Sequence, residues 1–178
     1  MGKAANSSIS LKQIHVTDNF WNKYVHLVKD VIIPYQWDIL NDKLEDVETS
    51  HCIENFKIAA GEKEGEFQGA VFQDTDVAKW LEAVGFVLNY ERDEKLEELA
   101  DETIELIGRA QQPDGYLNTY FTIKEPDGRW SNLMEGHELY TAGHMIEAAV
   151  AYYEATGKRR FLEIVSKFAD LVCQTFGS

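Results

Sequence analysis

Two irregular segments, residues 61–73 and 112–136, carry side chains whose chemistry suits the binding of a sugar. Aromatic rings stack on the C–H faces of a sugar, while carboxylate, amide and imidazole groups form hydrogen bonds with its hydroxyls. Each segment leads into the first helix of a predicted helix pair, so both should emerge on one face of the fold. The main sugar-binding candidates are Gln73, Asp74, Tyr116 and His137, and their neighbours of similar chemistry are Asp76, Asp114, Asn118, Tyr120, Trp130, Glu135 and Glu138.

Several of these residues also have a purely structural interpretation. Asp74 and Asp76 stand at a predicted helix start, where a carboxylate caps free N–H groups and compensates the helix dipole. Asp114 lies in a Pro-Asp-Gly turn, and any single aromatic ring could equally anchor a loop. His137 and His144 are seven positions apart, which is not the spacing of helical zinc ligands, and no third ligand is evident. The sequence therefore predicts no metal site in this chain.

Apolar residues at helical spacing predict the elements that must position these side chains. The apolar stripes span 20–31, 53–60, 77–88, 96–110, 139–153 and 161–176, with Pro34 kinking or ending the first helix and Gly61 ending the second. The last four stripes form two copies of one helical hairpin, because a shift of 65 positions places Leu96 on Phe161 and Ile107 on Val172. A hairpin that recurs at a fixed period is typical of stacked or toroidal all-α arrays.

The first 17 residues are predicted to form a separate N-terminal extension. Ile9, Leu11, Ile14 and Val16 roughly alternate with polar residues, which is typical of a short strand. We therefore expect a short N-terminal strand within residues 1–17, followed by an all-α domain over residues 18–178.

Composition narrows the possible partners and surroundings of the protein. The 178 residues include 17 Lys or Arg and 31 Asp or Glu, which gives a net charge of −14. Such an acidic chain is a poor partner for nucleic acid or for an anionic membrane, and no apolar run is long enough to cross a bilayer. Two cysteines, Cys52 and Cys173, cannot form a disulfide framework, so we expect a reducing compartment, a cytoplasmic location and buried, inert thiols.

Several segments of the chain, in this order, resemble the N-terminal part of the family-127 glycoside hydrolases, whose best-known members are bacterial β-L-arabinofuranosidases. The segments that carry the resemblance are Pro-Tyr-Gln-Trp (34–37), Glu-Asn-Phe-Lys-Ile-Ala-Ala-Gly (54–61), Val-Phe-Gln-Asp-Thr-Asp-Val-Ala-Lys-Trp-Leu-Glu (71–82), Gln-Gln-Pro-Asp-Gly-Tyr-Leu-Asn-Thr (111–119), His-Glu-Leu-Tyr-Thr-Ala-Gly-His (137–144), Ala-Thr-Gly-Lys (155–158) and Phe-Gly (176–177). They cover nearly the whole chain.

The resemblance implies a catalytic domain with an (α/α)6 toroid fold, of which residues 18–178 would form about half. It also implies that His137 contacts the bound sugar and that Gln73 and Asp74 line the same pocket, with an L-arabinofuranoside-like carbohydrate as the substrate. Family members use a zinc-bound cysteine thiolate as nucleophile and a glutamate as acid/base. Cys52 and Cys173 match none of those positions, so the resemblance places no catalytic residue and no zinc ligand in this chain.

A half-toroid would leave apolar edges uncovered. We therefore expect the isolated chain to be inactive and to self-associate through the open edge. Two other interpretations are compatible with the residues alone: a non-catalytic helical module that binds carbohydrate or acts as a scaffold, and another α/α-toroid enzyme such as a sugar epimerase.

Overall fold

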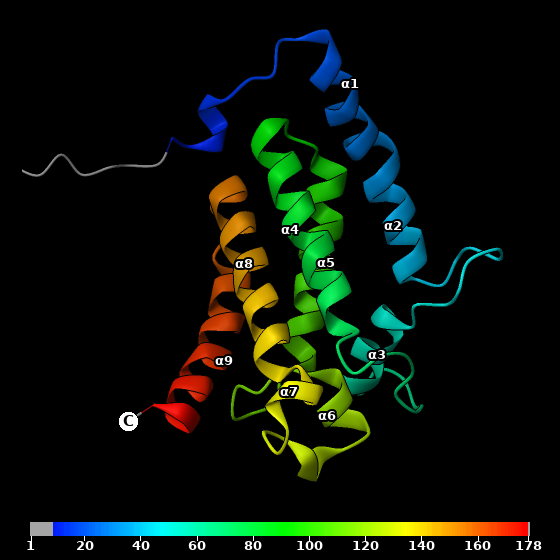
Figure 1. Cartoon of the computed structure of the whole chain (residues 1–178), viewed down its shortest axis with the longest axis vertical. Helices are drawn as coiled ribbons and strands as arrows, with labels where there is room; N and C mark the ends of the chain where they lie inside the picture. Colours follow the sequence, from blue (N-terminus) through cyan, green and yellow to red (C-terminus); the bar gives the residue numbers. More distant parts are fainter. Residues whose placement is uncertain (1–8, 178) are drawn as a thin grey trace, which may run out of the picture.

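The computed structural model describes residues 9–177, and every regular element within them is helical (Figure 1). The prediction of an all-α fold is therefore confirmed for these residues. In chain order the elements are η1 (Leu11–Gln13), α1 (Asn19–Leu27), η2 (Val28–Ile32), α2 (Ile33–Leu40), α3 (Cys52–Ala59), α4 (Asp74–Tyr90), α5 (Glu94–Ala110), α6 (Thr119–Ile123), η3 (Pro126–Gly128), α7 (Leu133–Gly136), α8 (Glu138–Thr156) and α9 (Arg160–Phe176).

Two long helical hairpins, α4/α5 and α8/α9, make up the body of the molecule (Figure 1). Helices α4 and α8 pack side by side and run in the same direction, and α5 packs against α9. Asp93 caps α5 by accepting hydrogen bonds from the N–H groups of Lys95 and Leu96, while Gly157 ends α8 at a positive φ of 76°. These hairpins confirm the repeat that the apolar stripes predict, whereas closure into a toroid stays a prediction.

The core lies between these hairpins and the helices that precede them. Trp80 of α4 is 1% exposed and packs against Trp37 of α2, with ring centroids 4.6 Å apart and an interplanar angle of 33°. Its indole N–H donates to the carbonyl oxygen of Ile33 at 3.1 Å. Helix α3 packs against α5 and α6 through the buried Ile53 and Phe56. These contacts fix α2 and α3 against the end of α4 where the two long connectors lie.

The predicted N-terminal strand is wrong for the residues that the structure describes. Leu11–Gln13 form a 3₁₀ turn, and Leu11, Ile14 and Val16 lie beside Phe86 and Tyr90 in an apolar hollow. Apolar residues at short intervals also suit a segment that rests on a helix surface, and a strand needs a second strand to pair with. The remaining residues of the predicted extension, 1–8, lie outside the described part of the chain.

The first long helix does not end at Pro34. It continues through the π-helical segment η2 into α2, and Pro34 occupies the first turn of α2. A wider helical turn before a proline accommodates the missing N–H and the bulk of the ring. Within residues 9–177, no helix has the length and apolar character that a bilayer-spanning segment requires.

Candidate functional site

Both long connectors emerge at the same end of the molecule, where α4 and α8 begin and where α6 and α7 lie (Figure 1). The ring of Phe72, just before α4, lies 5.2 Å from the ring of His137, just before α8. Tyr116 reaches the same region, because its hydroxyl donates a hydrogen bond to Glu138, the first residue of α8. The structure therefore brings together the segments that carry all four predicted sugar-binding residues.

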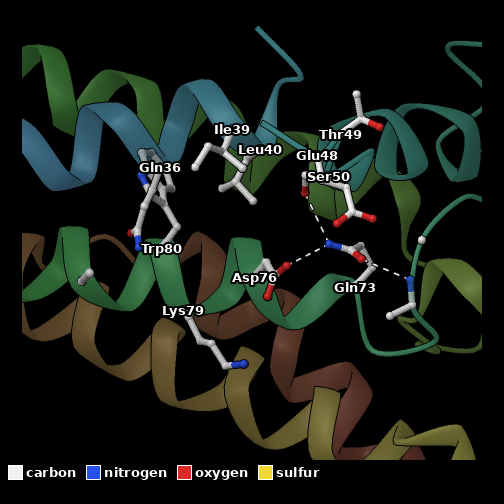
Figure 2. A pocket seen from close by; sticks show the side chains of 13 residues that line it. Gln36, Ile39, Leu40, Glu48, Thr49, Ser50, Gln73, Asp76, Lys79 and Trp80 are labelled. Atoms are coloured by element: carbon white, nitrogen blue, oxygen red, sulfur yellow. Dashed lines mark hydrogen bonds between the residues drawn. The ribbon is translucent and has the colours of Figure 1, made fainter. Parts of the chain in front are cut away.

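An open hollow of about 790 Å³ lies between α2, α4 and the segment before α3 (Figure 2). Its volume is within the usual range for small-molecule sites. Its lining combines apolar side chains, such as Ile39 and Ala83, with amide, carboxylate and ammonium groups. The lining residues are Gln36, Ile39, Leu40, Glu48, Thr49, Ser50, Gly69, Ala70, Gln73, Asp76, Lys79, Trp80 and Ala83.

Gln73 is held in a fixed orientation at the edge of this hollow. Its Nε2 donates hydrogen bonds to Ser50 Oγ at 3.3 Å and to Asp76 Oδ2 at 2.8 Å, and its Oε1 accepts one from the N–H of Ala70 at 3.1 Å (Figure 2). Gly69, at a φ of 97°, allows the close approach of the chain, because a Cβ there would lie 2.7 Å from Gln73 Oε1. The amide therefore serves mainly to orient the carboxylate of Asp76.

Asp76 and Lys79 are the charged groups that follow Gln73 at intervals of three residues along the first turns of α4. Burial raises the pKa of the Asp76 carboxyl, and the nearby Lys79 ammonium opposes that shift. Lys79 Nζ donates to Thr75 Oγ1 at 3.2 Å and lies 5.4 Å from the centre of the Tyr140 ring on α8. Lys79 thus connects the hollow to the neighbouring helix.

His137 lies on the α8 side of the site and is partly exposed. It adopts a left-handed backbone conformation with φ 54°, and its Nδ1 lies 2.8 Å from the carbonyl oxygen of Glu135. Since a carbonyl only accepts, the neutral imidazole carries its proton on Nδ1 and leaves the lone pair of Nε2 for a ligand hydroxyl. The ring is flanked by Phe72 and by Tyr140, which is 5.8 Å away. This arrangement suits a sugar hydroxyl beside an aromatic wall.

Asp74 does not cap α4 as the sequence predicts, because Gln73 holds the cap position and Asp74 is the first residue of the helix. Asp74 is 2% exposed, and its two carboxylate oxygens accept hydrogen bonds from the N–H and the hydroxyl of Thr119. Burial raises its pKa to about 6, although the hydrogen bonds from Thr119 act in the opposite direction. Asp74 therefore holds the second connector against α4.

Tyr116 is likewise fully buried. Its hydroxyl donates to the buried carboxylate of Glu138, and burial together with that carboxylate raises its pKa. The turn before it has the structure that Pro-Asp-Gly predicts, since Asp114 accepts the N–H of Tyr116 at 3.0 Å and Gly115 has a φ of 93°. In this structure Gln73 lines the hollow and His137 is partly exposed, whereas Asp74 and Tyr116 anchor the connector.

The raised pKa of Asp74 gives a testable pH dependence. A carboxyl whose pKa rises from 3.8 to about 6 on folding favours the folded state below pH 3.8 and loses that contribution as the pH rises through 6. The loss is about 3 kcal/mol. We therefore expect the free energy of unfolding of Asp74→Asn, minus that of the wild type, to rise by roughly 2–2.5 kcal/mol between pH 4 and 7, which is most of that loss. Urea denaturation across that range measures the difference, and a constant difference would contradict the prediction.

Sequence reasoning missed Gln36, Ser50 and Lys79, and it gave Asp76 both a sugar-binding and a capping interpretation. Gln36 follows a proline at which the helix was predicted to kink or end, and Ser50 lies in a segment without periodicity. The spacing of Gln73, Asp76 and Lys79 was the available signal, because residues three apart share one helix face.

The chain belongs to the GH127 catalytic domain family. The family model described as "Beta-L-arabinofuranosidase, GH127 catalytic domain" matches residues 13–178. This assignment removes the interpretation of the chain as an α/α-toroid enzyme of another family, such as an epimerase.

Individual relatives agree with this assignment. The chain is 41% identical to a non-reducing end beta-L-arabinofuranosidase of Bifidobacterium longum, over 92% of this chain and 27% of that protein. A crystal structure of a GH127 beta-L-arabinofuranosidase from Geobacillus stearothermophilus T6 is 63% identical with a TM-score of 0.91, over 92% of this chain and 26% of that one. The GH127 beta-arabinofuranosidase BT3674 is 36% identical with a TM-score of 0.84, over 93% and 26%. The chain thus spans about a quarter of the length of these relatives.

The zinc that the family resemblance implies does not fit the cysteines of this chain. Cys52 is buried in α3, and burial, followed by the charge of Asp74, raises the pKa of its thiol well above the usual value. The expectation that both thiols are buried is wrong for Cys173, which is exposed on α9. Within residues 9–177 neither cysteine belongs to a group of three potential metal ligands. A protonated, isolated thiol is a poor zinc ligand.

Proposed function

We propose that this chain forms the sugar-binding side of the catalytic site of a glycoside hydrolase that acts on β-L-arabinofuranosides. The observation that carries the proposal is the partly exposed imidazole of His137, which lies between the rings of Phe72 and Tyr140. His137 does not line the hollow itself, but Phe72 directly precedes Gln73, which does. Membership of the GH127 family and the names of the relatives support this substrate class.

In this proposal, residues 9–177 bind and orient the sugar but do not cleave it. His137 Nε2 accepts a hydrogen bond from a sugar hydroxyl, and the rings of Phe72 and Tyr140 cover the apolar face of the sugar. The nucleophile, the acid/base glutamate and the zinc of the whole enzyme then come from residues outside this range, so the isolated chain is inactive. The low cysteine content supports a cytoplasmic location.

Calorimetric titration with L-arabinose tests the sugar-binding role. We expect the wild-type chain to bind the sugar and His137→Ala to bind it about tenfold more weakly, because one hydrogen bond to a hydroxyl is lost. His26→Ala is the matched control, since it removes an exposed imidazole from α1. Absence of binding by the wild type, or equal binding by His137→Ala, would contradict the proposal.

We also propose that the isolated chain self-associates through the face of α8 and α9 that no other helix covers within residues 9–177. Leu139, Val150, Tyr153 and Phe176 are 39%, 43%, 37% and 46% exposed on these helices. Apolar side chains exposed together favour association with a second copy. We expect sedimentation velocity to show a concentration-dependent shift that Val150→Lys reduces. A wild-type monomer at all concentrations would refute this proposal.

A further inference from the structure

Three potential metal ligands meet where α4 packs against α8. One comes from α4, Glu82, and two come from α8, His144 and Glu147, and their ligating atoms all lie within 4.8 Å of one another. Ligands bound to one first-row metal ion at about 2 Å lie roughly 3–4 Å apart. Small rotations of these side chains are therefore enough to place all three on a single ion.

The internal repeat explains why the ligands converge. The shift of 65 positions that relates the hairpins places Glu82 on Glu147, and α4 and α8 pack side by side in the same direction (Figure 1). His144 precedes Glu147 by three residues, so both lie on one face of α8. An imidazole and a carboxylate at this spacing, joined by a carboxylate from the neighbouring helix, are a recurring way to bind metals between helices.

The charges around this cluster are unbalanced. Within residues 9–177, neither Glu82 nor Glu147 forms an ion pair with a lysine or arginine, and Lys79, one turn before Glu82, donates to Thr75 Oγ1. His144 Nδ1 has no solvent access and no hydrogen bond of acceptable geometry, although Glu147 Oε2 lies 3.2 Å away. Two close carboxylates and a buried nitrogen without a hydrogen bond are what a bound cation would satisfy.

We propose that Glu82, His144 and Glu147 form a binding site for a first-row divalent cation such as Zn²⁺ or Mn²⁺. One imidazole and two carboxylates suit these ions better than Mg²⁺ or Ca²⁺, which prefer oxygen ligands alone. The two carboxylate charges neutralise the ion, and the remaining coordination positions are free for water. The ring of Tyr140 packs edge-on against His144, 4.5 Å away, and also contacts His137. A metal at His144 would therefore fix the row of rings that ends at the sugar site.

The test is calorimetric titration of the untagged, EDTA-treated chain with Zn²⁺ and, separately, with Mg²⁺. We expect one equivalent of Zn²⁺ to bind and Mg²⁺ to bind far more weakly. His144→Gln and Glu82→Gln should each weaken Zn²⁺ binding by at least the roughly 10–100-fold that is typical for loss of an outer-sphere partner. Co²⁺ gives an independent readout, because Co²⁺ held by protein ligands in a four- or five-coordinate site absorbs visible light more strongly than the hydrated ion, and His144→Gln should reduce that absorption towards the level of the hydrated ion.

The matched control is Glu154→Gln, which removes the same charge from an exposed position near the end of α8. It should leave Zn²⁺ affinity unchanged, which separates a site from general attraction to an acidic chain. The metal-free Glu82→Gln variant should melt no lower than the wild type, because it relieves repulsion between two carboxylates. Failure of the wild type to bind Zn²⁺, unchanged affinity in both cluster variants, or an equal loss in Glu154→Gln would overturn the proposal.

Discussion

Replacing Glu138 with alanine should destabilise the protein by about 3–5 kcal/mol, since a buried hydroxyl and a partly buried N–H lose their acceptor at once. Glu138 is fully buried at the start of α8, where it accepts hydrogen bonds from the Tyr116 hydroxyl and from the N–H of Trp130 at 2.8 Å. Burial raises its pKa, and these two hydrogen bonds oppose the shift. The measurement is urea denaturation followed by circular dichroism at neutral pH.

Two further variants separate the lost hydrogen bonds from the lost volume. Glu138→Gln keeps the shape and one carbonyl acceptor, so it should cost less than the alanine variant. Tyr116→Phe removes the hydroxyl alone, and adding it to Glu138→Ala should cost little more, because the two residues share one interaction. A Glu138→Ala protein as stable as the wild type, or losses that simply add, would show that this pair does not hold the connector.

Glu138 and Asp74 have the same structural role at the starts of two different helices. Each is the first residue of a long helix, each is buried, and each accepts both a backbone N–H and a side-chain hydroxyl from the connector of residues 112–136. A carboxylate at a helix start is also stabilised by the helix dipole. The connector is thus tied to α4 at Thr119 and to α8 at Tyr116 and Trp130, which places His137 at the edge of the site.

The helices and their pairing into hairpins were predictable from the sequence, because each depends only on which face of a single helix is apolar. The apolar stripes that begin at Val77 and Leu139 predicted two matching hairpins, because burial of one helix face requires apolar residues to recur at the helical period. Their match in turn required the two long connectors to emerge at one end, and the pairing of Phe72 with His137 agrees with that.

The features that depend on contacts between distant segments were not predictable in this way. Asp74 at a helix start is indistinguishable in sequence from a capping residue, and only the approach of Thr119 turns it inward. Nothing in the sequence around Tyr116 distinguishes a ring that faces a sugar from a ring that packs in the core. The strand was mispredicted because alternating apolar residues over 9–16 indicate only that the segment rests on an apolar surface. That surface can belong to a sheet or to a helix, and here it is formed by Phe86 and Tyr90 of α4.

The close approach of α4 and α8 depends on Gly85. A Cβ at this position would lie 2.8 Å from the carbonyl carbon of Ala151 and 3.0 Å from the nitrogen of Tyr152. Both atoms belong to the backbone of α8, so they cannot move aside as the end of a long side chain can. The absence of a side chain at Gly85 therefore sets the spacing of the two helices, and with it the spacing of Lys79 from Tyr140 and of Glu82 from His144.

Gly85→Ala should consequently destabilise the protein by about 1–3 kcal/mol, even though alanine is the better helix former by roughly 1 kcal/mol. Gly143→Ala is the matched control: it lies inside α8 with no atom within 4 Å of the added Cβ, and it should stabilise by about 0.5–1 kcal/mol. Thermal and urea denaturation of both variants measure the contrast. If Gly85→Ala were as stable as Gly143→Ala, α4 and α8 would not be in contact at the position that aligns both the sugar site and the cation site.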